Sequence, residues 1–173
     1  MIGNSEKFLV DANSFITPYK NYYPFDFAPL FWEQLVLDEN RKHIYLLDLV
    51  NNEITRGEDD LSNWIDVSPN FNIISSCNES VISSYAEVMN YINESEYYNE
   101  NALNKWASEN VADPWLIACA LVGGYTIITL ENSSGSLNKN TPSRNPKIPD
   151  VASHFNVKCE NLFYMMRALN FRL

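Results

Sequence analysis

Cysteine is scarce in this chain. Only three of the 173 residues are cysteine, at positions 77, 119 and 159. The number is odd and the spacings are wide, which fits neither a zinc site nor a disulfide framework. The simplest interpretation is a reducing compartment, so we expect a cytoplasmic protein.

Long hydrophobic runs are also lacking. The first apolar stretch covers only residues 8–10 before Asp11, so we expect no secretory signal peptide. Residues 114–130 carry no charge, but Gly123-Gly124 interrupts them, and acids rather than basic residues lie at both ends. A buried helix followed by a buried strand explains this segment better than a membrane span.

Basic residues are also few. The chain has 12 Lys and Arg against 22 Asp and Glu, for a net charge of −10. Phosphate binding usually needs a basic face. The charge is uneven, because residues 131–173 carry +3 and the residues before them carry −13. Most of the acidic excess is a solvated surface, and part of it fits carboxylates that a cation neutralises.

The motifs of several enzyme classes are missing. Gly123-Gly124 lacks the pattern of a phosphate-binding loop and is typical of a helix end. The serines at 133–136 have no neighbouring base and indicate a flexible loop. His43 and His154 are far apart, with no ligand-like neighbours.

What the chain does have is an alternation of short apolar strands with helices. This pattern predicts a single α/β domain over residues 1–173, with a mainly parallel sheet flanked by helices. Residues 93–110, rich in Asn, Glu and Ser, are predicted to be a connector with short helical pieces around Tyr97 and Leu103. The expected strands are 7–11, 43–46, 73–75, 125–129 and 157–159, and the expected helices are 28–39, 47–56, 59–64, 78–92, 112–122, 149–155 and 162–169.

Four acids are predicted to meet at one edge of that sheet. Asp11 ends the first strand, and Glu131 follows the strand at 125–129. Asp113 begins the helix that feeds this second strand, so it lies at the same carboxyl edge, where open parallel sheets bind their ligands. Glu53 joins them if its helix passes over the crevice.

Such a cluster makes physical sense with a cation. Carboxylates packed together raise each other's pKa and destabilise the fold. Hard oxygen ligands suit Mg²⁺ or Mn²⁺, and such ions activate water and stabilise the leaving oxygen in phosphodiester cleavage.

Each acid also has a structural explanation. Asp113 before Pro114 is a good helix N-cap, and Glu131 fits a solvated strand end. Glu53 fits an exposed helix face paired with Arg56. Asp11 is the hardest to explain in this way, because an acid ending a buried strand is costly without a partner.

These segments resemble those of PIN domains, and within them a bacterial and archaeal PIN-like group akin to VapC toxins. Residues 8–16 (FLVDANSFI) resemble the opening strand, with its Asp and following polar residues. Residues 50–54 (VNNEI) resemble the helical Glu, and residues 112–118 (ADPWLIA) the third acid with its apolar helix. Residues 127–131 (IITLE) resemble a strand ending in Thr, any residue, then Asp, and residues 147–151 (KIPDV) resemble the tail of this group.

The resemblance implies a three-layer α/β/α fold and a Mg²⁺- or Mn²⁺-dependent ribonuclease, often the toxin of a toxin–antitoxin pair. Asp11, Glu53, Asp113 and Glu131 would be the catalytic, metal-binding acids, and Asn13 would orient the site or the substrate. The fourth acid is Glu where the pattern has Asp, and Asp150 is its rival. Residues 93–110 lengthen the chain beyond a minimal PIN domain.

Substrate and partners follow from the same interpretation. The basic residues Lys139, Arg144 and Lys147 lie in or near the loop after Glu131, where they would contact RNA phosphates. An ordinary solvated loop is the alternative. A protein antitoxin is the expected partner, and a homodimer is possible on this sequence. The competing functions are a non-catalytic PIN-like binding module and a DNA-directed nuclease.

Overall fold

Five parallel strands form the central sheet of the protein. The structure, a computed structural model, describes residues 6–67 and 71–173. The strands are in the order β3-β2-β1-β4-β5, and every neighbouring pair is parallel. The predicted α/β class with a parallel sheet is confirmed. The strands are β1 (Phe8–Val10), β2 (Ile44–Leu47), β3 (Asn72–Ile74), β4 (Thr126–Ile128) and β5 (Cys159–Glu160).

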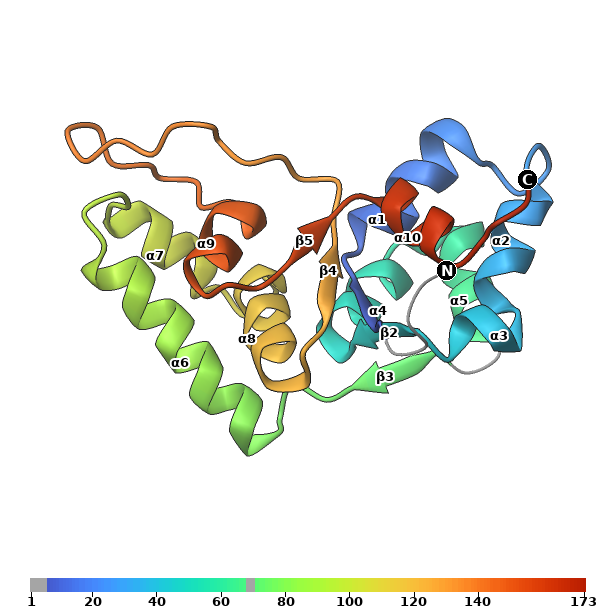
Figure 1. Ribbon diagram of the computed structural model, residues 1–173, viewed down its shortest axis with the longest axis horizontal. Coiled ribbons are helices and arrows are strands. Elements are labelled where there is room, and N and C mark those ends of the chain that lie inside the picture. The colour runs from blue at the N-terminus through green and yellow to red at the C-terminus, as the bar shows by residue number, and fades with distance from the viewer. Residues whose placement is uncertain (1–5, 68–70) are drawn as a thin grey trace.

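Helices cover both faces of the sheet, which gives three layers (Figure 1). One side carries α1 (Asn13–Thr17), the π-helix η1 (Pro18–Tyr22), α2 (Pro29–Val36), α3 (Asp38–Arg41), α4 (Asp48–Thr55), α5 (Asp60–Val67) and α10 (Leu162–Ala168). The other side carries α6 (Glu79–Glu94), α7 (Glu100–Trp106), α8 (Asp113–Gly123) and α9 (Ile148–His154).

The strand order creates a switch point between β1 and β4. The chain leaves β1 toward β2 through helices on one side, and leaves β4 toward β5 through α9 on the other (Figure 1). Open α/β sheets bind ligands outside the carboxyl ends of strands at such a point. Val10 pairs with Ile128, so Asp11 and Thr129 emerge side by side at this edge.

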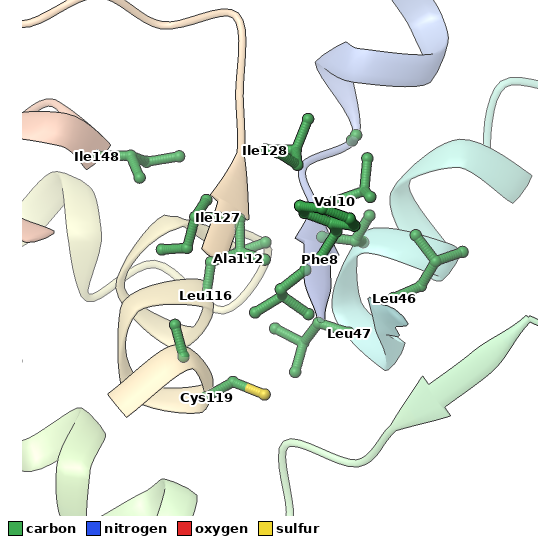
Figure 2. Packing of buried hydrophobic residues seen from close by; sticks show 14 of the residues in the cluster. Phe8, Val10, Leu46, Leu47, Ala112, Leu116, Cys119, Ile127, Ile128 and Ile148 are labelled. Atoms are coloured by element: carbon green, nitrogen blue, oxygen red, sulfur yellow. The ribbon is translucent and has the colours of Figure 1, made fainter. Parts of the chain in front are cut away.

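The core explains why α8 is apolar on every side. Its residues Leu116 and Cys119 face the buried side chains of β1 and β4, among them Phe8 and Ile127 (Figure 2). The same helix also packs against α6, so all of residues 116–120, in the middle of α8, are buried. Gly124 ends α8 in the left-handed conformation, with φ +65°, which turns the chain directly into β4.

Three local features differ from the sequence-based expectation: two predicted helices do not form as expected, and one helical segment was not predicted. The helix expected at 28–39 breaks at Leu37, where the buried Asn40 amide donates a 2.7 Å hydrogen bond to the Gln34 carbonyl oxygen at the end of α2. Helix α1 and the π-helix η1 were not predicted, because residues 13–22 show no clear apolar periodicity. No helix forms at Tyr97; the chain turns there, and Tyr98 bridges Ser143.

Within the part of the chain that the structure describes, every helix is too short or too polar to cross a bilayer. The uncharged segment 114–130 consists instead of helix α8, a glycine turn and strand β4, as expected from its sequence.

Candidate active site

Asp11 is the most buried acid at the switch point. It follows β1 directly, and only 4% of its surface is exposed. Its backbone N–H donates to the Ile128 carbonyl oxygen of β4 at 2.9 Å, and the Thr129 hydroxyl donates to Asp11 Oδ2 at 3.0 Å. The end of β4 therefore fixes both its backbone and its carboxylate.

Thr129 links Asp11 to the fourth acid. Its O–H donates to Asp11 and its oxygen accepts a hydrogen bond from the Glu131 backbone N–H at 3.1 Å, so one hydroxyl positions both acidic residues. The Glu131 carboxylate accepts Lys147 Nζ at 2.7 Å and the Ile148 backbone N–H at 2.9 Å. These bonds close the long loop between β4 and α9 at its base.

Asp113 does not cap its helix. It is the first residue of α8, the N-cap is Ala112 in helical conformation, and no side chain caps the helix end. The capping explanation of this acid is therefore wrong, and its carboxylate is not engaged by the helix backbone. The side chain is partly buried beside the other acids.

Glu53 reaches the site from α4 on the opposite face of the sheet. It is exposed, and the charge of Arg56 partly opposes the rise in its pKa that burial causes, without forming an ion pair with it. The Arg56 guanidinium donates instead to Asn110 Oδ1 at 2.8 Å. The predicted pairing of Glu53 with Arg56 is thus limited to a longer-range attraction.

The electrostatics show that the acids are neighbours. Burial and the charge of Asp113 raise the pKa of Asp11 to about 7, with smaller contributions from Glu53 and Glu131. Burial, followed by the charges of Glu131 and Glu53, raises the pKa of Asp113 to about 6. Desolvation also raises the pKa of Glu53, an effect that water weakens at this exposed position. Raised pKa values on neighbouring carboxyl groups are expected for a carboxylate cluster that holds no cation.

The donor set suits a hard divalent cation, but the carboxylates do not form a cage. Across residues 6–67 and 71–173, no three carboxylate, imidazole or thiol groups are arranged to hold a metal ion together. Glu131 is held by Lys147, and Glu53 stays in solvent. Mg²⁺ normally keeps several waters and uses one or two carboxylates, so Asp11 and Asp113 match its needs in number and chemistry.

The other predicted site residues have separate positions. Asn13 is exposed at the start of α1, two residues beyond Asp11. Asp150 accepts hydrogen bonds from the Ser133 hydroxyl and, at 3.1 Å, from the Ser134 backbone, and it is not among the main causes of the raised pKa of Asp11 or of Asp113. Of the two, only Glu131 is among the charges that raise the pKa of Asp11 and Asp113.

The three basic residues of the loop do not act together. Lys147 contacts Glu131, whereas Lys139 forms an ion pair with Glu96 and lies over the Tyr97 ring. Arg144 is exposed and makes no hydrogen bond or ion pair with any described residue. Lys139 is turned away because its part of the loop folds over the segment before α7.

Two residues near the site had no role assigned from the sequence. Thr129 is one, although its position two residues before Glu131 is the signal that could have identified it. Lys105 of α7 is the other, and its charge lowers the pKa of Asp113. Nothing in the local sequence around Lys105 marks it, because its position depends on how the insert folds back.

Together, the parallel sheet, the two helical layers and the acids at the switch point define an α/β protein with a PIN-like fold. The family described as "Domain of unknown function (DUF4411)" matches residues 8–173, and the chain belongs to this family. No curated protein matches the sequence. Among solved structures, the fold is similar to a chain in the crystal structure of VapBC2 from Rickettsia felis bound to a DNA fragment from their promoter. The TM-score is 0.51 at 13% sequence identity, and the match covers 89% of this chain and 97% of that chain.

Proposed function

We propose that this protein is a divalent-metal-dependent ribonuclease and the toxin of a toxin–antitoxin pair. The observation that carries the proposal is the placement of the buried Asp11 at the β1–β4 switch point, within electrostatic range of Asp113, Glu53 and Glu131. The fold likeness to a chain of VapBC2 and the resemblance of the four acidic segments to PIN domains support it.

Asp11 and Asp113 would hold Mg²⁺ or Mn²⁺, with Glu53 and Glu131 contributing through water. The ion, when bound, would supply an activated water and neutralise charge on the phosphate. Thr129 keeps the Asp11 carboxylate oriented through its hydrogen bond, and the apolar surroundings of Asp11 exclude bulk water. Glu131 would gain freedom to turn toward the site if Lys147 moved to an RNA phosphate.

The direct test is cleavage of single-stranded RNA by the purified protein with millimolar Mn²⁺ or Mg²⁺. We expect cleavage that is lost in EDTA and restored by the cation. Single-stranded DNA of the same sequence, assayed in parallel, tests the DNA-directed alternative. Cleavage of DNA alone would contradict the proposed substrate, and no metal-dependent cleavage of either would contradict the nuclease.

A non-catalytic binding module is the second candidate, and the ion pair between Lys147 and Glu131 favours it. This pair occupies one of the four acids in the structure. If the protein binds RNA without cutting it under any metal condition, this candidate is the better description.

Divalent cations should raise the melting temperature. A ligand that binds only the native state at a hundredfold excess over its dissociation constant stabilises it by about 2.7 kcal/mol. For a domain of this size, that corresponds to a rise of about 5–10 °C. Differential scanning calorimetry with and without millimolar Mn²⁺ would measure the shift.

The test variant for this metal response is Asp11→Asn, and its matched control is Asp66→Asn on α5. Asp66 is exposed and contributes to none of the raised pKa values at the site, so this variant should keep the full metal response. An equal response in Asp11→Asn and the parent chain would place the metal elsewhere.

A further inference from the structure

The insert before α8 and the loop after β4 are joined into one unit. The Ser143 backbone N–H donates to the Tyr97 carbonyl oxygen at 2.8 Å, and the Asn99 N–H donates to the Ser143 carbonyl oxygen at 3.1 Å. The Asn99 side-chain amide adds a bond to the Pro142 carbonyl oxygen at 3.2 Å. In Figure 1 the orange loop accordingly extends over to α7 before it returns to α9. We call residues 95–107 together with residues 137–147 the arm.

Lys105 is the fixed, unneutralised cation of this arm. Its ammonium group donates to Asn145 Oδ1 at 3.1 Å, which joins α7 to the loop a second time. The partner is a neutral amide, so the hydrogen bond orients the ammonium group without cancelling its charge. Among the described residues, no carboxylate forms an ion pair with Lys105.

The other lysines of the arm differ in this respect. Lys139 is paired with Glu96, and Lys147 is paired with Glu131, so both charges are largely neutralised within the protein. Lys105 also lies near the acids, because its partner Asn145 comes two residues before Lys147, whose ammonium group contacts Glu131 at 2.7 Å. It is therefore the positive charge best placed to meet an anion arriving at the acids.

We propose that the arm binds a phosphate of single-stranded RNA beside Asp113. Lys105 is the main contact, and Asn145 positions Lys105. This inference rests on the proposed function, because it assumes that the acids form the cutting site. The acidic crevice repels RNA by itself, so a cation held at its rim gives the substrate a place to bind. Arg144, exposed on the same arm, is available for the adjoining phosphate.

The test measures binding of a fluorescent single-stranded RNA by anisotropy over a series of salt concentrations, in the Asp11→Asn background to prevent cleavage. A lysine that contacts one phosphate contributes about 0.7 to the slope of log affinity against log salt for single strands. We expect Lys105→Gln to lower the slope by about this amount and to weaken binding about three- to tenfold. Asn145→Ala should weaken binding less, because it frees Lys105 without removing the charge.

The matched control is Lys42→Gln. Lys42 is an exposed lysine two residues before β2, at the opposite, amino edge of the sheet, and its replacement changes the net charge by the same amount. Equal effects of Lys105→Gln and Lys42→Gln would show that only overall charge matters and would overturn the proposal. So would the absence of RNA binding by the Asp11→Asn chain.

A failure of the proposed RNA binding by the arm can be distinguished from a failure of the proposed nuclease activity. If Lys105→Gln weakens RNA binding but the parent chain cuts no RNA, the arm is supported and the nuclease is not. If the parent chain cuts RNA and Lys105→Gln binds and cuts like the parent, the nuclease stands and the arm is refuted.

Discussion

Induced expression of the parent chain is expected to arrest bacterial growth, and the Asp11→Asn variant is expected to leave growth nearly normal. Asparagine keeps the size of the side chain and can still accept the hydrogen bond from Thr129, so the fold is retained. It removes the negative charge that would hold the cation. Disturbing even the groups around a metal site typically costs 10- to 100-fold in affinity or activity, and loss of a ligand should cost at least about a hundredfold.

Two controls make the growth experiment decisive. Asp66→Asn should arrest growth like the parent chain, since this exposed residue lies on α5 and has no influence on the pKa values of the acids. Immunoblots should show equal amounts of all three proteins. Arrest by Asp11→Asn at equal abundance would mean that the toxicity does not come from the acidic site.

The second large effect concerns stability against pH. Without divalent metal, the free energy of unfolding should fall as pH rises from about 4 to about 8. The pKa of Asp11 is about 7 and that of Asp113 about 6 in the folded protein, both above the ordinary value of 3.8. Between these limits the folded chain holds more protons than the unfolded chain, so raising the pH favours unfolding.

The size of this loss is a few kcal/mol, because each unit of pKa difference is worth about 1.4 kcal/mol. Urea denaturation in EDTA at several pH values would measure it. Asp11→Asn should flatten the profile and, at pH 8, be more stable than the parent chain, because it removes a buried charge and the repulsion of its neighbours. Asp66→Asn should keep the parent's profile.

Mn²⁺ should restore the stability of the parent chain at pH 8 and have little effect near pH 4, where the acids are protonated. A parent profile that is flat between pH 4 and 8 in EDTA would contradict the buried, mutually repelling carboxylates on which the proposed function depends.

The sequence by itself determined the class of fold and the edge of the sheet at which Asp11 and Asp113 lie. Alternating strands and helices predict a parallel sheet, and in such a sheet every strand ends at the same edge. Asp11 after an apolar strand and Asp113 at the start of an apolar helix could therefore be placed from local patterns alone. The buried helix and strand within residues 114–130 followed from the same reasoning, because apolar character and a glycine break are local properties.

Only the tertiary structure decided how polar side chains pair across long loops. Glu131 binds Lys147, while Asp150 binds Ser133 and Ser134. Nothing in the sequence shows that the partners are not reversed, with Asp150 binding Lys147 and Glu131 binding the two serines. The position of Lys105 near the acids likewise depends on the hydrogen bond of Asn99 to Ser143 and that of Lys105 to Asn145, and in each pair the partners lie some 40 residues apart in the chain. Local periodicity fixes which face of an element is buried, but the partner of an exposed side chain depends on where a distant loop closes, and that closure is set by the packing of the whole fold.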